Sequence, residues 1–261
     1  MKISSTFRAR VLAREWLSGT FVNLGCAMSA EIAGTAGFDW VLLDHEHGPG
    51  GEDTLLHQLH ALGGTPAFSI VRIAANEPPR FKRVLDLGAG GVMVPYVNNE
   101  AEARAAVAAL RYPPRGVRGV AKFTRAAGFG QEFGDYYAHA HEWLVTMAQI
   151  ETPEALANID AIAAVDGVDV LFIGQLDLST NMGIQSDLEH PRFVEARRRV
   201  AEAAKRAGKA AGILLTAAAQ VAGVRDEGFT MVALGSDGGA VNAGLRQNAA
   251  VLLSPSRPAR S

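Results

Sequence analysis

Short apolar runs and Ala-rich amphipathic segments alternate along the chain. The apolar runs are rich in Val, Ile, Leu and Phe and are bounded by glycine, proline or charge, which is typical of buried strands. We expect strands at 21–29, 39–46, 66–73, 91–97, 144–151, 168–175, 209–216 and 230–237. Apolar residues at helical spacing predict helices at 51–62, 77–87, 100–110, 153–164, 191–208 and 217–228. Strands that alternate with helices of this length indicate right-handed βαβ units and a parallel sheet.

Such units, closing on themselves, predict an α/β fold of the (β/α)8 TIM-barrel type. The alternative is an open doubly wound sheet, but no GxGxxG follows the first strand, which weakens its dinucleotide-binding form. Residues 6–17 predict an extra N-terminal helix that caps the bottom of the barrel. Residues 111–143 are too long and too rich in glycine for a simple connection, and such loops are usually functional or disordered. We expect 1–261 to be a single domain, with its core at about 18–252 and a flexible tail at 253–261.

Composition and charge narrow the class of protein. With 261 residues, 48% of them hydrophobic, the chain can bury a large core. The net charge is −2 and no basic block stands out, which argues against nucleic acid and anionic membranes as partners. Cys26 is the single cysteine and forms no internal disulfide, as fits a reducing cytosol. The chain has neither the apolar core of a signal peptide nor a run of about 18 apolar residues, so we expect a cytoplasmic protein.

Polar residues gather where the predicted strands end, and in a TIM barrel the active site forms at the carboxyl ends of the strands. These residues are Asp44-His45-Glu46-His47 after the second strand, Arg72 after the third, Gln149 and Glu151 after the fifth, and Gly174-Gln175-Leu176-Asp177 after the sixth. Glu151 and Asp177 could each be a helix cap. Together, on consecutive strands, they suit a hard divalent cation such as Mg²⁺ or Mn²⁺.

Arg72 and the histidines suggest how a substrate could be held and deprotonated. An arginine binds a carboxylate through two parallel hydrogen bonds, and a strand-end position is poorly placed for a surface ion pair. His47 with Asp86 could form a base and its orienting carboxylate. Each could equally be an ordinary loop or helix residue, and His45 competes with His47. No lysine is expected at the barrel mouth, which disfavours a Schiff-base mechanism.

Several of these segments resemble the HpcH/HpaI aldolases, which are class II pyruvate aldolases. The family includes 4-hydroxy-2-oxoheptanedioate aldolase and 2-keto-3-deoxy sugar acid aldolases. The resemblance extends over nearly the whole chain. It is carried by LDHEHGP at 43–49, VR at 71–72, LDLGA at 85–89, YPP at 112–114, RG at 118–119, QIET at 149–152, FIG at 172–174 and DLS at 177–179.

The resemblance implies a role for each candidate residue. His47 would be the base and Asp86 its partner, Arg72 would bind pyruvate, and Glu151 and Asp177 would be the metal ligands. The substrate would also contact Asp44, Gln149, Gly174, Gln175, Leu176 and Leu214. The chain departs from the usual family pattern at His45, where a small residue is common, and at Gln175-Leu176, where the family commonly has Gly-Pro-x-Asp-Leu-Ser. Both departures bear on the choice of aldehyde.

The implied reaction is reversible retro-aldol cleavage of 4-hydroxy-2-oxo acids to an aldehyde and pyruvate or hydroxypyruvate, through a metal-stabilised enolate. The cofactor would be Mg²⁺ or Mn²⁺, with Co²⁺ or Zn²⁺ as alternatives. The family forms hexamers, each a trimer of dimers, in which the long loop around 118–125 reaches a neighbour's site. The alternatives are an oxaloacetate decarboxylase or an acyl-CoA lyase with the same enolate chemistry, or a non-catalytic 2-oxo acid binding protein. A CoA lyase would need a basic nucleotide-binding surface, and a binding protein would need no base.

Overall fold

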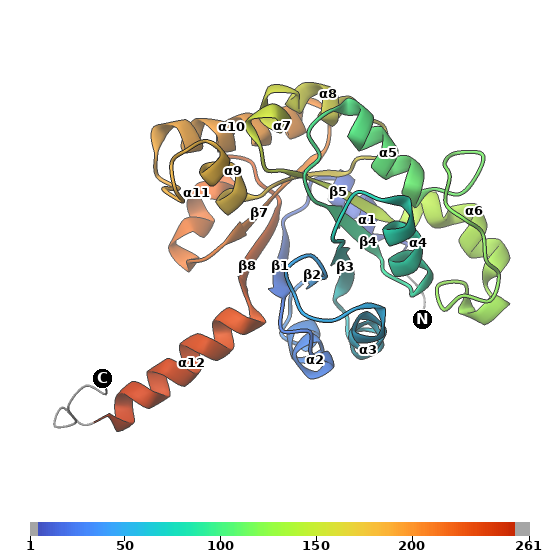
Figure 1. Cartoon of the computed structure of the whole chain (residues 1–261), viewed down its shortest axis with the longest axis horizontal. Helices are drawn as coiled ribbons and strands as arrows, with labels where there is room; N and C mark the ends of the chain where they lie inside the picture. Colours follow the sequence, from blue (N-terminus) through green and yellow to red (C-terminus); the bar gives the residue numbers. More distant parts are fainter. Residues whose placement is uncertain (1–4, 254–261) are drawn as a thin grey trace.

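The computed structural model describes residues 5–253, which form a closed barrel of parallel strands surrounded by helices (Figure 1). Strand β8 pairs with β1 and closes the barrel, which confirms the TIM-barrel prediction. Side chains fill the barrel on the inside and helices cover it on the outside, so the strands are almost wholly buried. In order around the barrel they are β1 (Leu17–Val22), β2 (Trp40–Asp44), β3 (Phe68–Arg72), β4 (Gly91–Val94), β5 (Val145–Ile150), β6 (Val170–Ile173), β7 (Ala210–Leu215) and β8 (Met231–Ser236).

The predicted helices are all found, with ends within about two residues for most of them. The segment 153–164 is divided at Asn158 into two short helices, and the long segment 111–143 contains a 3₁₀ turn and a helix. The helices after the first are α2 (Ala27–Thr35), α3 (Glu52–Leu62), α4 (Pro78–Asp86), α5 (Glu100–Leu110), α6 (Phe133–Trp143), α7 (Pro153–Ala157), α8 (Ile159–Ala164), α9 (Gln175–Asn181), α10 (Pro191–Arg206), α11 (Val221–Asp226) and α12 (Asp237–Leu252), with 3₁₀ turns η1 (Gly128–Gly130) and η2 (Ala218–Gln220).

The first strand was predicted wrongly. We expected it at 21–29, but β1 covers 17–22 and residues 27–35 form helix α2. Both elements are apolar and only a short turn separates them, with Gly25 at a φ of 64°. The small residues Ala30, Ala33 and Gly34 are buried on α2, and a Cβ at Gly34 would overlap Thr65. The small residues of this run therefore allow α2 to pack closely against the end of α3 and the turn after it, and the run does not continue strand β1.

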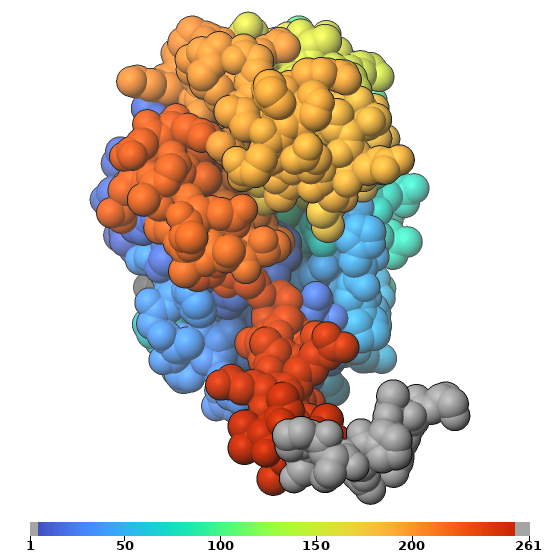
Figure 2. All heavy atoms as spheres, turned by 90° about the vertical axis from the view of Figure 1, so that its left-hand side faces the viewer, coloured from blue at the N-terminus to red at the C-terminus, as the bar shows by residue number. Residues whose placement is uncertain are grey.

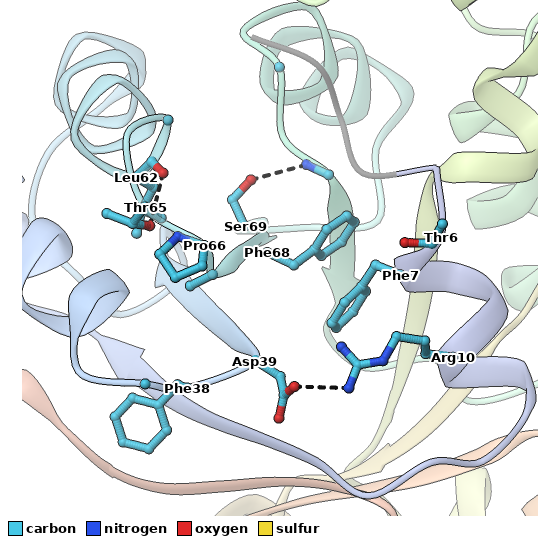
Figure 3. Close-up of a pocket in the computed structure, with 15 residues that line it drawn as sticks. Thr6, Phe7, Arg10, Phe38, Asp39, Leu62, Thr65, Pro66, Phe68 and Ser69 are labelled. Carbon is cyan, nitrogen blue, oxygen red and sulfur yellow. Dashed lines mark hydrogen bonds and ion pairs between the residues drawn. The ribbon is translucent and has the colours of Figure 1, made fainter.

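Helix α1 (Phe7–Leu12) crosses the amino-terminal ends of the strands, where the sequence predicted a cap (Figure 3). The Phe7 ring stacks on Phe68 at the start of β3, with 4.1 Å between centroids. Arg10 forms an ion pair of 3.0 Å with Asp39, which precedes β2. The helix ends at residue 12 because the chain must turn into β1, so it is shorter than the predicted 6–17.

Helix α12 leaves the barrel after β8 and points away from it (Figures 1 and 2). It has no buried residue, although Val241, Leu245 and Val251 are large and apolar. None of the helices in residues 5–253, α12 included, has the length and apolarity that a bilayer span needs. Of the predicted flexible tail, residues 254–261 lie outside the described part of the chain.

Candidate active site

A cavity of about 190 Å³ opens at the carboxyl ends of the barrel strands. It brings together the predicted residues from β3, β5, β6 and β7 and from the loops that follow β2 and β6. Its lining is Phe21, His47, Arg72, Gln149, Glu151, Phe172, Ile173, Gly174, Gln175, Leu176, Asp177, Leu188, Leu214 and Thr216. A larger hollow of about 430 Å³ lies beside α1, at the opposite end of the barrel (Figure 3). None of the predicted site residues lines it, so the smaller cavity is the candidate site.

Arg72 is held by two carboxylates at the end of β3. Its Nε and Nη2 donate to the Asp44 carboxylate at 3.0 and 2.7 Å, and its Nη1 lies 3.1 Å from Oε2 of Glu46. Burial raises the pKa of Asp44, but the hydrogen bonds and charge of Arg72 outweigh burial and lower it overall. Asp44 also accepts the backbone N–H of His47, which fixes the loop after β2. Asp44 therefore contacts the guanidinium of Arg72, and it does not line the cavity.

Glu151 and Asp177, the predicted metal ligands, are joined by Tyr96. The Tyr96 backbone N–H donates to Oε2 of Glu151 at 3.0 Å, and its hydroxyl donates to Oδ1 of Asp177 at 3.1 Å. Glu151 is 1% exposed. Its pKa rises to about 7, first because of burial and then because of repulsion from Glu46 and Asp177. Three acidic groups thus share a region in which Arg72 supplies the positive charge.

Gln149 and Gly174 shape the surroundings of Glu151. Gln149 donates its amide N–H to Oε1 of Glu151 at 2.7 Å, and its own Oε1 is buried without a hydrogen-bond partner in the described residues. A Cβ on Gly174 would overlap the Glu151 carboxylate. Glycine at this position therefore makes room for a metal-ligand candidate, besides lining the cavity. Across residues 5–253, no three His, Cys, Asp or Glu side chains converge as a complete ligand set, so an ion held here would take further oxygens from outside the chain.

His47 lies at the cavity mouth, but its predicted partner lies at the other end of the barrel. The His47 side chain is 65% exposed, and its Nε2 is 3.8 Å from Oε2 of Glu46. Asp86 is the last residue of α4, just before β4 begins, so it lies at the amino-terminal face. It accepts a 2.7 Å bond from Arg118, which is buried and 4.4 Å from the centre of the Tyr112 ring. Within one chain, the structure does not bring His47 and Asp86 together.

The remaining predicted substrate contacts line one side of the cavity. The amide N–H of Gln175 donates to the backbone carbonyl of Leu214, which ties the start of α9 to β7. Leu176 is 64% exposed, and the Leu214 side chain is partly buried. The two departures from the family pattern therefore lie apart, because His45 bonds to Gln58 of α3 and does not line the cavity.

Sequence reasoning missed Tyr96, although it contacts both metal-ligand candidates. The signal was present, because Tyr96 follows the carboxyl end of β4 by two residues, and the strand-end rule applies to it as well. It has a φ of 50°, in the left-handed region, which is uncommon for a residue other than glycine. Burial and the neighbouring Asp177 raise the pKa of its hydroxyl to about 12, so Tyr96 remains a hydrogen-bond donor.

The profile of the HpcH/HpaI aldolase/citrate lyase family matches residues 17–243, from the first strand of the barrel to the start of α12. The chain belongs to this family. It is 41% identical over 231 residues to 5-keto-4-deoxy-D-glucarate aldolase of Enterobacter sp. (strain 638), which covers 88% of this chain and 90% of the relative. This family member is a carbon–carbon lyase of the class II aldolase type, as its sequence predicted.

Solved structures agree with that membership. An HpcH/HpaI aldolase/citrate lyase family protein from Burkholderia cenocepacia J2315 superimposes with a TM-score of 0.92 at 33% identity, covering 96% of this chain and all of that one (100%). The citrate synthase SbnG superimposes with a TM-score of 0.85 at 26% identity, covering 95% and 97%. Relatives with this barrel are thus named for more than one reaction, and the fold alone does not decide the second substrate.

Proposed function

We propose that this protein cleaves 4-hydroxy-2-oxo acids reversibly to an aldehyde and pyruvate or hydroxypyruvate, with a divalent metal ion as cofactor. The observation that carries the proposal is the meeting of Glu151, Asp177 and Arg72 in one cavity at the carboxyl ends of the strands. Carboxylates can hold a cation there, and an arginine beside them can hold the carboxylate of a 2-oxo acid.

The donor set fits a hard divalent cation. Glu151 and Asp177 offer charged oxygens, and Gln149 adds a buried carbonyl oxygen without a hydrogen-bond partner among residues 5–253. Such oxygens suit Mg²⁺ or Mn²⁺ better than Zn²⁺ or Co²⁺, which nitrogen and sulfur ligands favour. A cation would also offset the repulsion that helps to raise the pKa of Glu151. When bound, it would supply Lewis acidity to the carbonyl group of the 2-oxo acid.

Arg72 would bind and orient the substrate carboxylate. Asp44 occupies Nε and one N–H of Nη2, and Glu46 lies 3.1 Å from Nη1, which leaves one N–H on each of Nη1 and Nη2 for the substrate carboxylate. Because Asp44 fixes the plane of the guanidinium, Arg72 meets the substrate in one orientation. It would stabilise negative charge as it develops on the enolate.

His47 would move the proton. In cleavage, the imidazole takes the proton of the 4-hydroxyl group, and the bond between C3 and C4 breaks. The aldehyde leaves, and C3 of the pyruvate enolate takes a proton from the imidazolium or from water. The side chain is 65% exposed, so it can exchange its proton with water, and no proton is gained or lost over the cycle.

The base would be oriented by Asp86 of the partner subunit. Asp86 and the loop around Arg118 lie together at the amino-terminal face, and they can reach a His47 only in another copy. Mixing two inactive variants, His47→Ala and Asp86→Ala, should restore activity, because hybrid oligomers contain some sites with both residues. If the mixed oligomers stay inactive, Asp86 does not act across subunits.

Helix α12 supports an oligomer. A groove of about 620 Å³ runs between α2 and β8, lined by Ile32, Phe38, Leu215 and Leu234 among others. In a TIM barrel this outer face is normally covered by the eighth helix, but α12 points away from it. We propose that α12 of a second copy packs there, as a swapped element, within the hexamer that the family resemblance implies.

The direct test is release of pyruvate from a 4-hydroxy-2-oxo acid, followed through lactate dehydrogenase. We expect turnover with Mg²⁺ or Mn²⁺, loss of turnover in EDTA, and loss in the His47→Ala variant. Oxaloacetate as sole substrate tests the decarboxylase alternative. Turnover that survives complete removal of metal would refute the proposed cofactor. Absence of turnover with every 2-oxo acid would refute the proposed lyase activity and favour the alternative of a non-catalytic 2-oxo acid binding protein.

A further inference from the structure

Tyr96 connects three neighbouring strands at the carboxyl face of the barrel. It lies two residues after β4, and it donates to one carboxylate directly after β5 and to another on the first turn of α9, which follows β6. Its backbone N–H lies 3.0 Å from Oε2 of Glu151, and its hydroxyl lies 3.1 Å from Oδ1 of Asp177. One residue therefore spans the two metal-ligand candidates, and its length limits how far apart they lie.

Hydrogen bonds fix the backbone around Tyr96. The Val97 N–H donates to the carbonyl of Gln149 on β5 at 3.2 Å, and the Asn98 side-chain amide donates to the Tyr96 carbonyl at 3.0 Å. The φ of Tyr96 is 50°, a left-handed conformation that costs free energy in a residue with a Cβ. Such conformations persist where the surrounding structure requires them, and they cluster at functional sites. In this conformation, the N–H and the hydroxyl of the same residue both face carboxylates.

The two carboxylates differ in how firmly the chain holds them. Glu151 accepts from the Gln149 amide at 2.7 Å as well as from the Tyr96 backbone N–H. For the Asp177 carboxylate, the Tyr96 hydroxyl is the one hydrogen-bond donor within the described part of a single chain. Asp177 and Glu151 carry like charges close enough to interact, so each pushes the other away. The hydroxyl of Tyr96 opposes this repulsion at Asp177.

We infer that Tyr96 is a positioning residue of the metal site, whose two donors hold Glu151 and Asp177 at a fixed separation before the cation binds. The inference rests on the proposed cofactor and adds a residue to the site. The hydroxyl bonds to Oδ1, so Oδ2 of Asp177 stays available to a cation. A carboxylate that is already oriented loses less conformational freedom when it binds a cation, and this raises the affinity.

The test is the affinity of the protein for Mn²⁺, measured by EPR titration. Tyr96→Phe keeps the ring and the backbone N–H and removes the hydroxyl alone. We expect Mn²⁺ binding to weaken by roughly 10–100-fold, as for other outer hydrogen-bond partners of metal ligands. The matched control is Tyr137→Phe on α6, which removes a hydroxyl of similar exposure that donates to the Pro113 carbonyl at 2.9 Å. The control should bind Mn²⁺ as the unsubstituted protein does, and both variants should keep its Tm.

A second readout follows Tyr96 itself. The near-ultraviolet absorbance of a tyrosine depends on what its hydroxyl contacts, and the chain has four tyrosines, so the contribution of one is measurable. Added Mg²⁺ should shift the tyrosine spectrum of the unsubstituted protein and of Tyr137→Phe, because a cation on Asp177 draws electron density from the oxygen that accepts the Tyr96 hydroxyl. Tyr96→Phe should show no such shift. A residue that only supported the fold would not give this signal.

The outcomes separate the inference from the proposed function. Weaker Mn²⁺ binding by Tyr96→Phe, together with the missing shift, supports the inference. If Tyr96→Phe binds Mn²⁺ as tightly as the unsubstituted protein or more tightly, or shows the same shift with Mg²⁺, the inference is overturned and the proposed cofactor stands. If the unsubstituted protein binds no Mn²⁺, the proposed cofactor fails and the inference fails with it.

Discussion

Replacing Glu151 by glutamine removes a charge that the fold keeps away from water. The carboxyl is 1% exposed, and its pKa is about 7 in place of the ordinary 4.5. One pKa unit corresponds to about 1.4 kcal/mol, so ionised Glu151 costs the metal-free protein about 3 kcal/mol of stability. The Glu151 carboxyl binds its proton more tightly in the folded protein than in the unfolded chain. The free energy of unfolding therefore falls as the pH rises from about 4.5 through about 7.

The substitution Glu151→Gln should keep the hydrogen bonds of the site. The new amide oxygen can accept the backbone N–H of Tyr96, as Oε2 does in the native protein. The new amide N–H would face Gln149, whose own Oε1 is buried without a partner in the described residues. A rotation of the Gln149 amide by about half a turn presents that oxygen to it. The variant therefore loses a charge and no hydrogen bond.

The assay is thermal or urea unfolding in EDTA at about pH 8 and about pH 5. At about pH 8 the variant should be more stable by about 3 kcal/mol, which raises Tm by roughly 6–12 °C for a chain of this size. At about pH 5 the gain should shrink to under about 1 kcal/mol, because the folded protein then keeps this carboxyl protonated and the pH lies close to the pKa of 4.5 in the unfolded chain. Glu154→Gln on α7, an exposed carboxylate three residues after Glu151, is the matched control and should change little at either pH.

Added Mn²⁺ should remove most of this difference at about pH 8. A ligand that binds the native state alone stabilises it by about 2.7 kcal/mol at a hundred times its Kd. The protein without the substitution should gain this stability from the metal, and the Glu151→Gln variant should gain little. The reasoning is refuted if the variant is less stable than the native protein at about pH 8 in EDTA, or if the difference is the same at both pH values.

Three further substitutions test other parts of the site. Arg72→Lys should raise KM for pyruvate by roughly 10–100-fold, because an ammonium group cannot hold Asp44 and a substrate carboxylate in one plane; steady-state kinetics measure this. Gly174→Ala should weaken Mn²⁺ binding by about tenfold or more by displacing the Glu151 carboxylate, as titration by EPR would show; unchanged affinity would mean that Glu151 is not a ligand. Leu245→Glu on α12 should give a smaller species in light scattering if this helix packs against another subunit, and an unchanged mass would argue against the swap.

The sequence by itself determined the barrel and predicted several residues of the candidate site. Alternating strands and helices allow few topologies, and a residue at the carboxyl end of a strand, or soon after it, lies at the carboxyl face. Arg72, Gln149, Glu151 and Asp177 follow this rule, and all of them line one cavity. The same rule would have found Tyr96. It also places Asp86, which precedes a strand, at the opposite face, so its distance from His47 was implicit in the sequence.

Only the tertiary structure decided the environment of each group. Spacing along the chain does not show that Tyr96 bonds to Glu151 and Asp177 at once, since these three residues come from different strands. Nor does it show that burial and two nearby carboxylates raise the pKa of Glu151 to about 7, because the cost of a charge depends on everything packed around it. Likewise, the departure of α12 from the barrel depends on what covers its apolar side chains, and a single chain's pattern of residues does not contain that information.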